Sequence, residues 1–331
     1  MPKLDIIIPH WKEDEWLMAP MFKILRMQRN VKFSDFRVLI VLDGEDIQLS
    51  DRFKQFVADF PFRTEWFNVE HNGISAARNA GLDHSTADWV IFCDSDDAFL
   101  CTTSLQSYFG VMDKNKAMIA SAFLEEGWDK RNKRMLLLHH DGHDSIFVHG
   151  KVFNRKWLKA NKVRFNDDVK LHEDSYFISL AKYVMKDTDA VYIDEPLYLW
   201  QFNKNSVTRL YDNFVLRTYD LLCKKNSAIV EEFLRRGMFV PAKGVVCRTI
   251  TDAYCWLHSK SWNKEGNEEL IRDAEDCVSL FLKKYYYIFK SANDIVINTG
   301  LNQLKAELIQ YNDFDEGSVI PFKDWLDKLR K

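Results

Sequence analysis

The sequence predicts an α/β protein, in which a mixed, Rossmann-like sheet flanked by helices is followed by an all-helical C-terminal region. In residues 1–115, short apolar runs alternate with helix-like segments, which indicates parallel strands joined by crossover helices. Residues 116–210 carry apolar runs around polar turns, as antiparallel strands do, and residues 211–331 carry only helical patterns. We therefore expect an α/β domain over 1–210 and a helical domain over 211–331.

Four strands and three helices alternate in the first half of the α/β domain. The expected strands are Leu4–Ile8, Arg37–Leu42, Phe62–Phe67 and Trp89–Cys93, and the expected helices are Glu13–Met27, Asp51–Phe60 and Gly73–His84. Pro9, Asp43, Asn72 and Asp94 lie at the carboxyl ends of these strands. Because ligands of such sheets bind at those ends, we expect one cleft to gather the four residues.

The second half and the C-terminal region are predicted from the same patterns. Strands are expected at Ala117–Phe123, Arg134–His139, Ser145–Val148, Ala190–Ile193 and Leu197–Phe202, and helices at Lys156–Asn161 and Glu173–Met185. The C-terminal helices are expected at 211–236, 241–259, 266–288, 295–311 and 321–330. Aromatic residues recur there at helical spacing, which favours a packed core. An oligomer interface or an acceptor-holding surface is the alternative for this region.

Composition excludes several classes of protein. The net charge of -3 and the pI near 6.3 give no basic footprint for broad nucleic-acid binding. Six cysteines without C-x-x-C spacing predict reduced thiols rather than a zinc knuckle. The N-terminus lacks the pattern of a signal peptide, and no apolar run approaches the ~20 residues that span a bilayer. We expect a cytoplasmic protein, free or bound peripherally to a membrane.

Three carboxylates follow the fourth strand, in Asp94-Ser95-Asp96-Asp97. Carboxylates at the end of a buried strand are costly unless a positive charge meets them. Oxygen ligands on a short acidic turn suit Mg²⁺ or Mn²⁺, which often bridge to the phosphates of a substrate. The alternative is a solvated acidic loop that caps the next helix.

The segment Asn72-Gly73-Ile74-Ser75-Ala76-Ala77-Arg78-Asn79-Ala80-Gly81 precedes that strand. Gly73 and Ser75 can open a helix whose free backbone N–H groups attract anions. Arg78 adds a forked donor that suits a phosphate or a nucleoside. The alternative is an ordinary amphipathic helix with one surface arginine.

These two segments, in this order, resemble glycosyltransferase family 2, the inverting, nucleotide-sugar-dependent enzymes of the GT-A fold. The resemblance extends over residues 4 to about 209. It is carried by Ile6-Ile7-Ile8-Pro9, Val38 to Gly44, Asn72 to Gly81, Phe92 to Asp97, His149 to Arg155, Phe165 to Phe177 and Tyr198 to Thr208. It implies a nucleotide-sugar-binding half over 1–115 and an acceptor-side half over 116–210.

The resemblance also implies roles for the acidic residues. Asp96 is expected to be the direct metal ligand, and Asp94 to lie nearer the ribose or a metal-bound water, while Asp97 orients them. Asp174 is expected to be the general base that takes a proton from the acceptor hydroxyl. The alternative for Glu173-Asp174 is plain capping of a helix N-terminus by acids.

The expected donor site consists of five residues, with others in support. Pro9, Asp43, Asn72, Arg78 and Asp94 are expected to bind the nucleotide. Glu173, His172 and Ser206 are expected to support the site, Ser206 within a loop near the diphosphate that also includes Asn205 and Thr208.

The chain departs from the family pattern at three positions. Leu42 replaces the first of two aspartates that many members carry, so only Asp43 remains to contact the base. Gln201 and Asn203 stand where arginine or histidine is common in the family. Diphosphate contacts could instead come from Lys204, Arg209 or His172.

The segment His139-His140-Asp141-Gly142-His143-Asp144 contains three histidines and two carboxylates. Zinc binding, a donor-sugar or acceptor loop, and a plain polar turn are the three interpretations, and the spacing favours the turn.

We therefore predict a metal-dependent, inverting glycosyltransferase that uses Mn²⁺ or Mg²⁺ and a nucleotide-sugar, most simply a UDP-linked hexose or N-acetylhexosamine. The expected acceptor is a surface glycan or wall polymer. A nucleic-acid or protein acceptor is the alternative within the class. A nucleotidyltransferase would need a glycine-rich basic loop after the first strand, and Pro9 to Asp14 provide none. A non-catalytic binding or scaffold protein with a retained fold is the remaining alternative.

Overall fold

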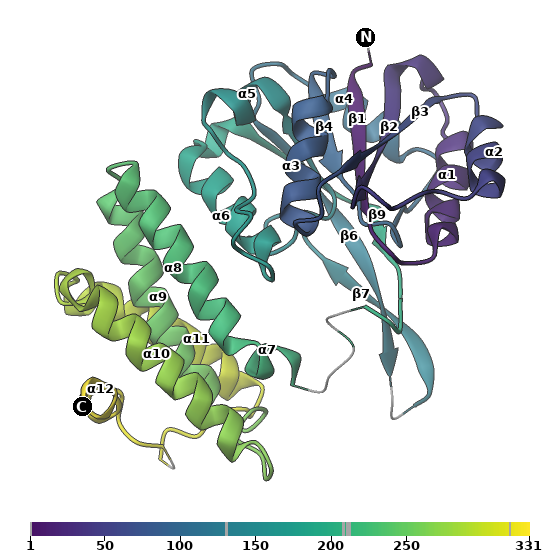
Figure 1. The fold of residues 1–331 in the computed structure, drawn as a ribbon. Helices are drawn as coiled ribbons and strands as arrows, with labels where there is room; N and C mark the ends of the chain where they lie inside the picture. Colours follow the sequence, from purple (N-terminus) through teal and green to yellow (C-terminus); the bar gives the residue numbers. More distant parts are fainter. Residues whose placement is uncertain (1, 130–131, 207–208, 210–212, 318) are drawn as a thin grey trace. The chain divides into compact units, whose positions relative to one another are not determined.

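The computed structural model describes residues 2–129, 132–206, 209, 213–317 and 319–331. The chain forms two compact units, Met1–Lys204 and Asn205–Lys331. The first unit contains a mixed sheet with flanking helices and the second contains only helices (Figure 1). The predicted fold class is therefore confirmed.

The parallel part of the sheet has the order β3-β2-β1-β4. These strands are β1 (Leu4–His10), β2 (Phe36–Asp43), β3 (Arg63–Val69) and β4 (Trp89–Phe92). They are joined through η1 (Glu15–Met18), α1 (Ala19–Arg26), η2 (Phe33–Asp35), α2 (Asp51–Ala58) and α3 (Ile74–His84). The alternation predicted from the sequence is thus present.

Strand β1 continues past the predicted end and includes Pro9. The pairing of β4 with β1 stops at Ile7–Phe92, whereas β2 remains paired with β1 as far as His10. Pro9 therefore lies where one side of the strand no longer has a neighbour, and its missing N–H costs little. The predicted helix Glu13–Met27 is a 3₁₀ turn followed by α1, with Pro20 in the first turn of α1, where proline is tolerated.

The other half of the sheet is mixed. Its strands are β5 (Ala98–Phe99), β6 (Met118–Asp129), β7 (Arg134–His140), β8 (Lys151–Asn154) and β9 (Ala190–Trp200). From β4 the order continues β8-β6-β9-β5, with β7 on β6; β6 and β9 are parallel, and the other pairs are antiparallel. The helices and turns of this half are α4 (Ser104–Val111), α5 (Arg155–Ala160), α6 (Glu173–Val184) and η3 (Asp187–Asp189).

One strand prediction in this half was wrong, and two other predicted strands proved to be parts of one strand. Residues 145–148 form a loop instead of a strand, because the Asp144 carboxylate accepts the backbone N–H groups of Ile146 and Phe147 and turns the chain. The strand follows immediately, as β8. The two strands predicted at 190–193 and 197–202 form the single strand β9, whose register against β6 shifts near Ser121 and Ala122, so that it continues through Pro196.

Strands β1 and β2 are buried along their whole length, which explains their almost continuous apolar sequences. Helix α3 packs directly on them at Gly81. A Cβ atom at Gly81 would lie 2.4 Å from Cγ2 of Ile7 and 3.2 Å from Cγ2 of Val41. The glycine thus lets α3, and the arginine it carries, approach the sheet closely.

One buried charge ties the elements of this core together. The Asp5 carboxylate accepts hydrogen bonds from Nε and Nη2 of Arg37, from Oγ of Ser85 and from the backbone N–H groups of Thr86 and Ala87. The pair therefore joins β1, β2 and the turn before β4.

The helical unit contains α7 (Phe214–Arg217), α8 (Tyr219–Arg235), α9 (Phe239–Leu257), α10 (Glu268–Phe289), α11 (Asp294–Gln310) and α12 (Phe322–Arg330). The helix predicted at 211–236 is two helices, α7 and α8, which meet at the non-helical Thr218, and residues 211–212 lie outside the described part. Helix α9 contacts α8, α10 and α11. Tyr254, Tyr285 and Trp325 are buried, which confirms that aromatic residues form a core here.

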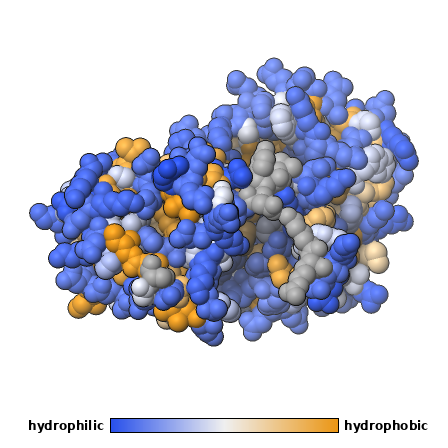
Figure 2. All heavy atoms as spheres, turned by 90° about the horizontal axis from the view of Figure 1, so that it is seen from below, coloured by the Kyte–Doolittle hydropathy of each residue, from blue (hydrophilic) through white to orange (hydrophobic). Residues whose placement is uncertain are grey.

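In the described part of the chain, no helix is long and apolar enough to span a membrane. Hydrophilic residues dominate the face shown in Figure 2, and hydrophobic residues form only small separate areas on it.

Candidate active site

The acidic turn Asp94–Asp97 follows β4 and meets side chains from three other segments. Arg78 comes from α3, His149 from the loop before β8, and Glu173 and Asp174 from the first turn of α6. Contacts between these segments build a single site at the carboxyl end of β4.

Arg78 is the link between the acidic turn and α6. Its Nη2 donates to Oδ1 of Asp94 at 2.6 Å, and its Nη1 donates to Oε1 of Glu173 at 3.0 Å and to Oδ1 of Asp174. The guanidinium is 1% exposed, and its carbon lies 5.2 Å from the centre of the Phe165 ring. Burial lowers the pKa of Arg78, but Asp174, Asp94 and Glu173 outweigh it and raise that pKa. Arg78 thus stays charged.

The two outer carboxylates of the acidic turn differ in charge state. Burial raises the pKa of Asp94, but the attraction of Arg78 and the contact with His149 outweigh it and hold that pKa well below its usual value. Asp97 is completely buried, and its Oδ2 accepts the Tyr198 hydroxyl at 2.7 Å. Burial raises the pKa of Asp97; the attraction of His149 lowers it, but burial, with repulsion from Asp94 and Asp96, outweighs that and holds the pKa well above its usual value. Asp94 is therefore ionised at neutral pH, and Asp97 binds a proton more readily than a free aspartate.

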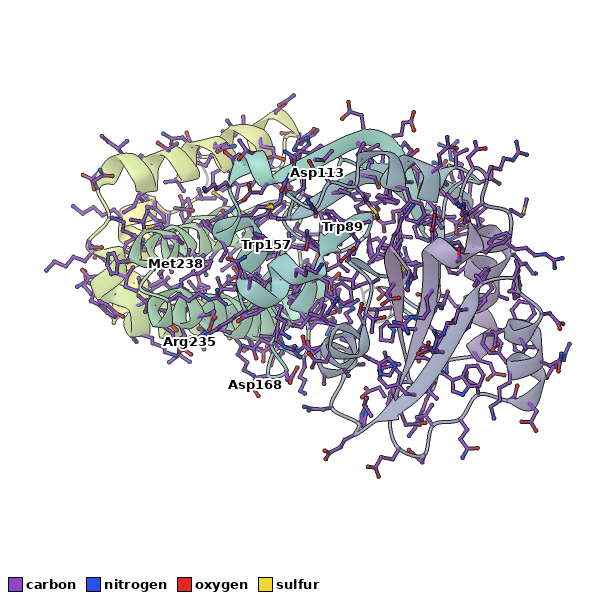
Figure 3. The ribbon with its side chains drawn as sticks, turned by 90° about the horizontal axis from the view of Figure 1, so that it is seen from above. Trp89, Asp113, Trp157, Asp168, Arg235 and Met238 are labelled. Carbon is purple, nitrogen blue, oxygen red and sulfur yellow. The ribbon has the colours of Figure 1, made fainter. Side chains whose placement is uncertain are left out.

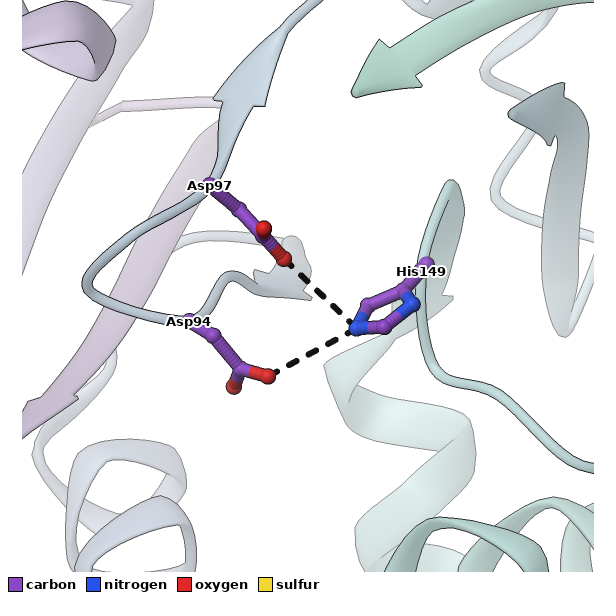
Figure 4. Close-up of side chains that lie close together, drawn as sticks. All are labelled: Asp94, Asp97 and His149. Carbon is purple, nitrogen blue, oxygen red and sulfur yellow. Dashed lines mark ion pairs between the residues drawn. The ribbon is translucent and has the colours of Figure 1, made fainter. Parts of the chain in front are cut away.

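His149 lies between these two carboxylates (Figure 4). Its Nε2 is 3.5 Å from Oδ2 of Asp94 and 3.6 Å from Oδ2 of Asp97. The ring is 4% exposed and stacks on Tyr198 at an interplanar angle of 12°. Neither ring nitrogen has a hydrogen bond within the described residues. Burial lowers the pKa of His149, but Asp94 and Asp97 outweigh it and raise that pKa.

No role was predicted for His149 from the sequence. The signal that could have found it is the placement of a histidine directly after the apolar pair Phe147-Val148 and shortly before a buried strand. A polar ring in such a run needs a polar partner.

Asp94, Asp97 and His149 are suited to hold a divalent metal. One ligand atom from each lies within 4.8 Å of the others. Two carboxylates and an imidazole with buried, unsatisfied nitrogens form a donor set that accommodates Mn²⁺. Asp96, which the resemblance assigns as the direct ligand, is not in this group; its Oδ2 accepts Nδ2 of Asn203 at 2.8 Å. Its role as a ligand stays a prediction.

Glu173 and Asp174 differ in their contacts although both begin α6. Besides Arg78, Asp174 accepts the backbone N–H of Val148 on Oδ2 at 3.2 Å and remains 16% exposed. Burial, with repulsion from Asp174, raises the pKa of Glu173 to about 7. His172 directly precedes the helix with a left-handed φ of 64°. The first turn of α6 therefore offers two partly exposed carboxylates, of which Glu173 has the pKa raised to about 7.

The expected donor residues form a second group at the ends of β1 and β2. The Asp43 carboxylate accepts the backbone N–H groups of Asn72 and Gly73, both at 3.1 Å, and lies 2.9 Å from Nδ1 of His71. Asn72 is exposed, and its backbone and side-chain oxygens accept hydrogen bonds from Nζ of Lys170. Pro9 is buried in β1. These contacts explain the local fold, and the donor-binding roles stay predictions.

Within the described part of the chain, two hollows near the strands bear on the site. One, of about 640 Å³, is at the carboxyl ends of β1 and β2 and is lined by His10 to Glu15, Asp46 to Asp51 and Lys54. The other, of about 850 Å³, is at the amino end of β4 and includes Trp89, Asp113 and Trp157, which are labelled in Figure 3. The first hollow is thus at the end of the strands where the acidic turn lies, and the second is at the opposite end of the strands.

The His139–Asp144 segment does not provide a metal site of its own. The described part of the chain contains one group of three or more potential His, Cys, Asp or Glu ligands, and it is Asp94, Asp97 and His149. His140 contacts Glu125 at 2.9 Å, and His143 stacks on Tyr192. Ser206 and Asn205 belong to the second unit, and Thr208 lies outside the described residues, so their predicted roles stay predictions.

Comparison with known proteins identifies relatives of this chain. The family described as Glycosyl transferase family 2 matches residues 5–186. The uncharacterized glycosyltransferase EpsJ of Bacillus subtilis is 24% identical over 232 residues, which cover 63% of this chain and 64% of EpsJ. The minor teichoic acid biosynthesis protein GgaA of Bacillus subtilis is 25% identical over 256 residues, covering 66% of this chain and 56% of GgaA. The matches thus span less than two thirds of either relative.

A solved structure shares the fold. Residues 1–349 of TarS from Staphylococcus aureus superpose with a TM-score of 0.57 at 14% identity, covering 93% of this chain and 92% of that structure. The same TarS fragment in complex with UDP-GlcNAc gives a TM-score of 0.53 at 15% identity, covering 93% and 81%. The mixed sheet followed by helices is therefore an architecture that this chain shares with a solved protein.

Proposed function

Because the chain belongs to glycosyltransferase family 2, we propose that it is a metal-dependent, inverting enzyme that moves a sugar from a nucleotide-sugar to an acceptor hydroxyl. One observation carries the proposal beyond family membership. The buried Arg78 binds Asp94 of the acidic turn and Asp174 of α6 at the same time. A charged group that can face the donor and a carboxylate that can act as a base therefore belong to one site.

Asp174 is the group that we assign as the general base. As the acceptor oxygen attacks the anomeric carbon, its proton passes to the Asp174 carboxylate. The bond from the anomeric carbon to the donor phosphate oxygen breaks, and the nucleoside diphosphate leaves with its electron pair. Direct displacement inverts the anomeric centre, so no enzyme nucleophile is needed. Asp174 is suited to this role because it is partly exposed and held by two donors, Arg78 and the Val148 N–H.

Asp94, Asp97 and His149 would hold the metal, with Asp96 beside them. When bound, Mn²⁺ or Mg²⁺ supplies positive charge that stabilises the departing diphosphate. The ligand groups available to the metal include the ionised carboxylate of Asp94, which Arg78 holds in place, and the buried imidazole of His149, which lies between two carboxylates.

The relatives support a choice of donor and acceptor. TarS binds UDP-GlcNAc in its solved complex, and GgaA takes part in minor teichoic acid biosynthesis. We therefore propose a UDP-linked hexose or N-acetylhexosamine as the donor, and a wall polymer or surface glycan as the acceptor. In this proposal residues 1–210 form the catalytic domain, and residues 211–331 contribute to acceptor binding or self-association. The protein acts in the cytoplasm or at a membrane surface.

Turnover of a panel of nucleotide-sugars tests the proposal. We expect hydrolysis of at least one UDP-sugar by the purified protein with Mn²⁺, lost on chelation of the metal, and the inverted anomer as the product of transfer. Absence of binding and turnover with every nucleotide-sugar in the presence of metal would refute it. Salt-sensitive binding to DNA by a protein that turns over a nucleotide-sugar would favour a nucleic acid as the acceptor.

A further inference from the structure

The loop formed by residues 143–148 is built around one carboxylate, that of Asp144. Its Oδ1 accepts the backbone N–H groups of Ile146 at 2.9 Å and Phe147 at 2.8 Å. Its Oδ2 accepts Nζ of Lys151 at 2.5 Å. The side chain of Asp144 therefore fixes the fold of the 143–148 loop from inside.

Lys151 is an unusual residue to find at this place. Its side chain is completely buried, and the strand β8 that it begins is buried at every position. A buried ion pair is weak evidence for added stability, since an apolar pair of similar size often serves as well. What the pair does provide is a fixed distance between β8 and the 143–148 loop.

A second lysine ties the same loop to α6. Nζ of Lys182 donates to the backbone oxygens of His143 and Asp144, the latter at 2.8 Å, and contacts Oγ of Ser145 at 3.3 Å. Helix α6 is the helix whose first turn carries Asp174. The loop is thus fixed to the element that presents the base.

Val148, the last residue of the 143–148 loop, and His149, which follows it, contact different parts of the site. The Val148 N–H donates to Oδ2 of Asp174, and the next side chain, His149, places Nε2 between Asp94 and Asp97. Consecutive residues of one anchored segment therefore contact the base and the proposed metal ligands.

We propose that Asp144, Lys151 and Lys182 are positioning residues, which hold the 143–148 loop so that Val148 orients Asp174 and His149 completes the metal group. The inference rests on the proposed function, and it assigns a role to the histidine-rich segment that ends at Asp144. Residues of this kind, which orient the groups that bind or react, typically contribute a factor of about 10–100 to activity or metal affinity.

Two lysine variants and a matched control test the proposal in the full-length protein. Lys151→Met removes the buried cation, and Lys182→Met removes the half-buried one, which is the milder change. Lys156→Met removes a lysine of the same charge that is 76% exposed and paired with Asp88 on the surface. Each is measured for Mn²⁺ affinity by electron paramagnetic resonance, for kcat and donor KM at saturating Mn²⁺, and for folding by circular dichroism.

We expect kcat for transfer and Mn²⁺ affinity to fall by about 10–100-fold in Lys151→Met and by a smaller factor in Lys182→Met. Donor KM at saturating metal and the Lys156→Met control should stay near the wild-type values. Folded lysine variants with wild-type kcat and Mn²⁺ affinity would overturn the proposal. So would failure of both variants to fold, because the lysines would then be general stability elements.

The outcome also separates this inference from the proposed function. If the wild-type protein turns over no nucleotide-sugar, the proposed function fails, and the Mn²⁺ measurement still decides whether the lysines position His149. If the wild type is active and the variants match it, only the inference fails.

Discussion

Arg78→Lys would keep a positive charge on α3 but remove the fork that reaches the acidic turn and α6 together. Arg78 makes three charge-assisted hydrogen bonds, to Asp94, Glu173 and Asp174. A single ammonium cannot span both sides, so at least one bond is lost, at about 1.5–3 kcal/mol. The unit that contains Arg78 is Met1–Lys204. A protein unit of this length loses about 2–4 °C of melting temperature per kcal/mol of lost stability, so we expect a decrease of about 3–12 °C.

The assay is thermal unfolding followed by circular dichroism, with donor turnover measured on the same samples. Arg164→Lys is the matched control, since Arg164 also binds one carboxylate, Asp83, through two nitrogens but is 43% exposed. Exposed pairs contribute about 0–1 kcal/mol, so its melting temperature should change little. A melting temperature for Arg78→Lys equal to that of the wild type, or equal effects of the two variants, would refute the bridging role of Arg78.

Three further predictions follow from other contacts. Asp174→Asn should abolish transfer while UDP-sugar binding, measured by calorimetry, is retained; unchanged transfer would exclude Asp174 as the base. His149→Gln should weaken Mn²⁺ binding by about tenfold or more, and Asp96→Asn by less, because Asp96 is outside the group of three ligands; the reverse order would support Asp96 as the direct ligand. Asp5→Asn should cost about 3–5 kcal/mol of unfolding free energy at pH 7, since Arg37 loses its buried partner. Burial raises the pKa of Asp5, but its hydrogen bonds and Arg37 outweigh it and lower that pKa, so this stability is present above an unfolded pKa of about 3.9 and lost as pH falls through the folded value. Urea unfolding should therefore show the difference between wild type and variant shrinking in acid, and a constant difference would contradict the assignment.

The periodic parts of the fold could be predicted from the sequence. Strand β4, helix α3 and the helices of the second unit lie within a few residues of their expected positions, because burial on one face or on both leaves a regular apolar pattern. The same reliance on apolar patterns produced the wrong strand prediction at 145–148. The apolar residues there match a strand, but Asp144 accepts hydrogen bonds from two backbone N–H groups and bends the chain.

The site could be predicted only in part, because side-chain direction depends on partners distant in the sequence. The acidic turn, Arg78 and the Glu173-Asp174 pair were identified as candidates, and the structure brings them together. The sequence suggested that Arg78 faces an anionic ligand, yet it is buried among three carboxylates of the chain itself.

Two features of the acidic turn show why its details needed the structure. Asp97 is buried because β5 begins directly after it and pairs with β9, a contact between segments about 100 residues apart. His149 meets Asp94 and Asp97 across about half that separation in the chain. No local pattern encodes either contact.

The acidic turn also limits the curvature of the sheet. Strands β4 and β5 are four inter-strand steps apart in the sheet order, or roughly 19 Å if the sheet were flat. The six residue steps from Phe92 to Ala98 could reach roughly 20 Å only when fully extended, but the hydrogen bond from the Asp97 N–H to the Asp94 oxygen shortens them. The sheet must therefore curl. The length of the turn that carries the carboxylates limits the distance between β4 and β5, and so sets how strongly the sheet curves.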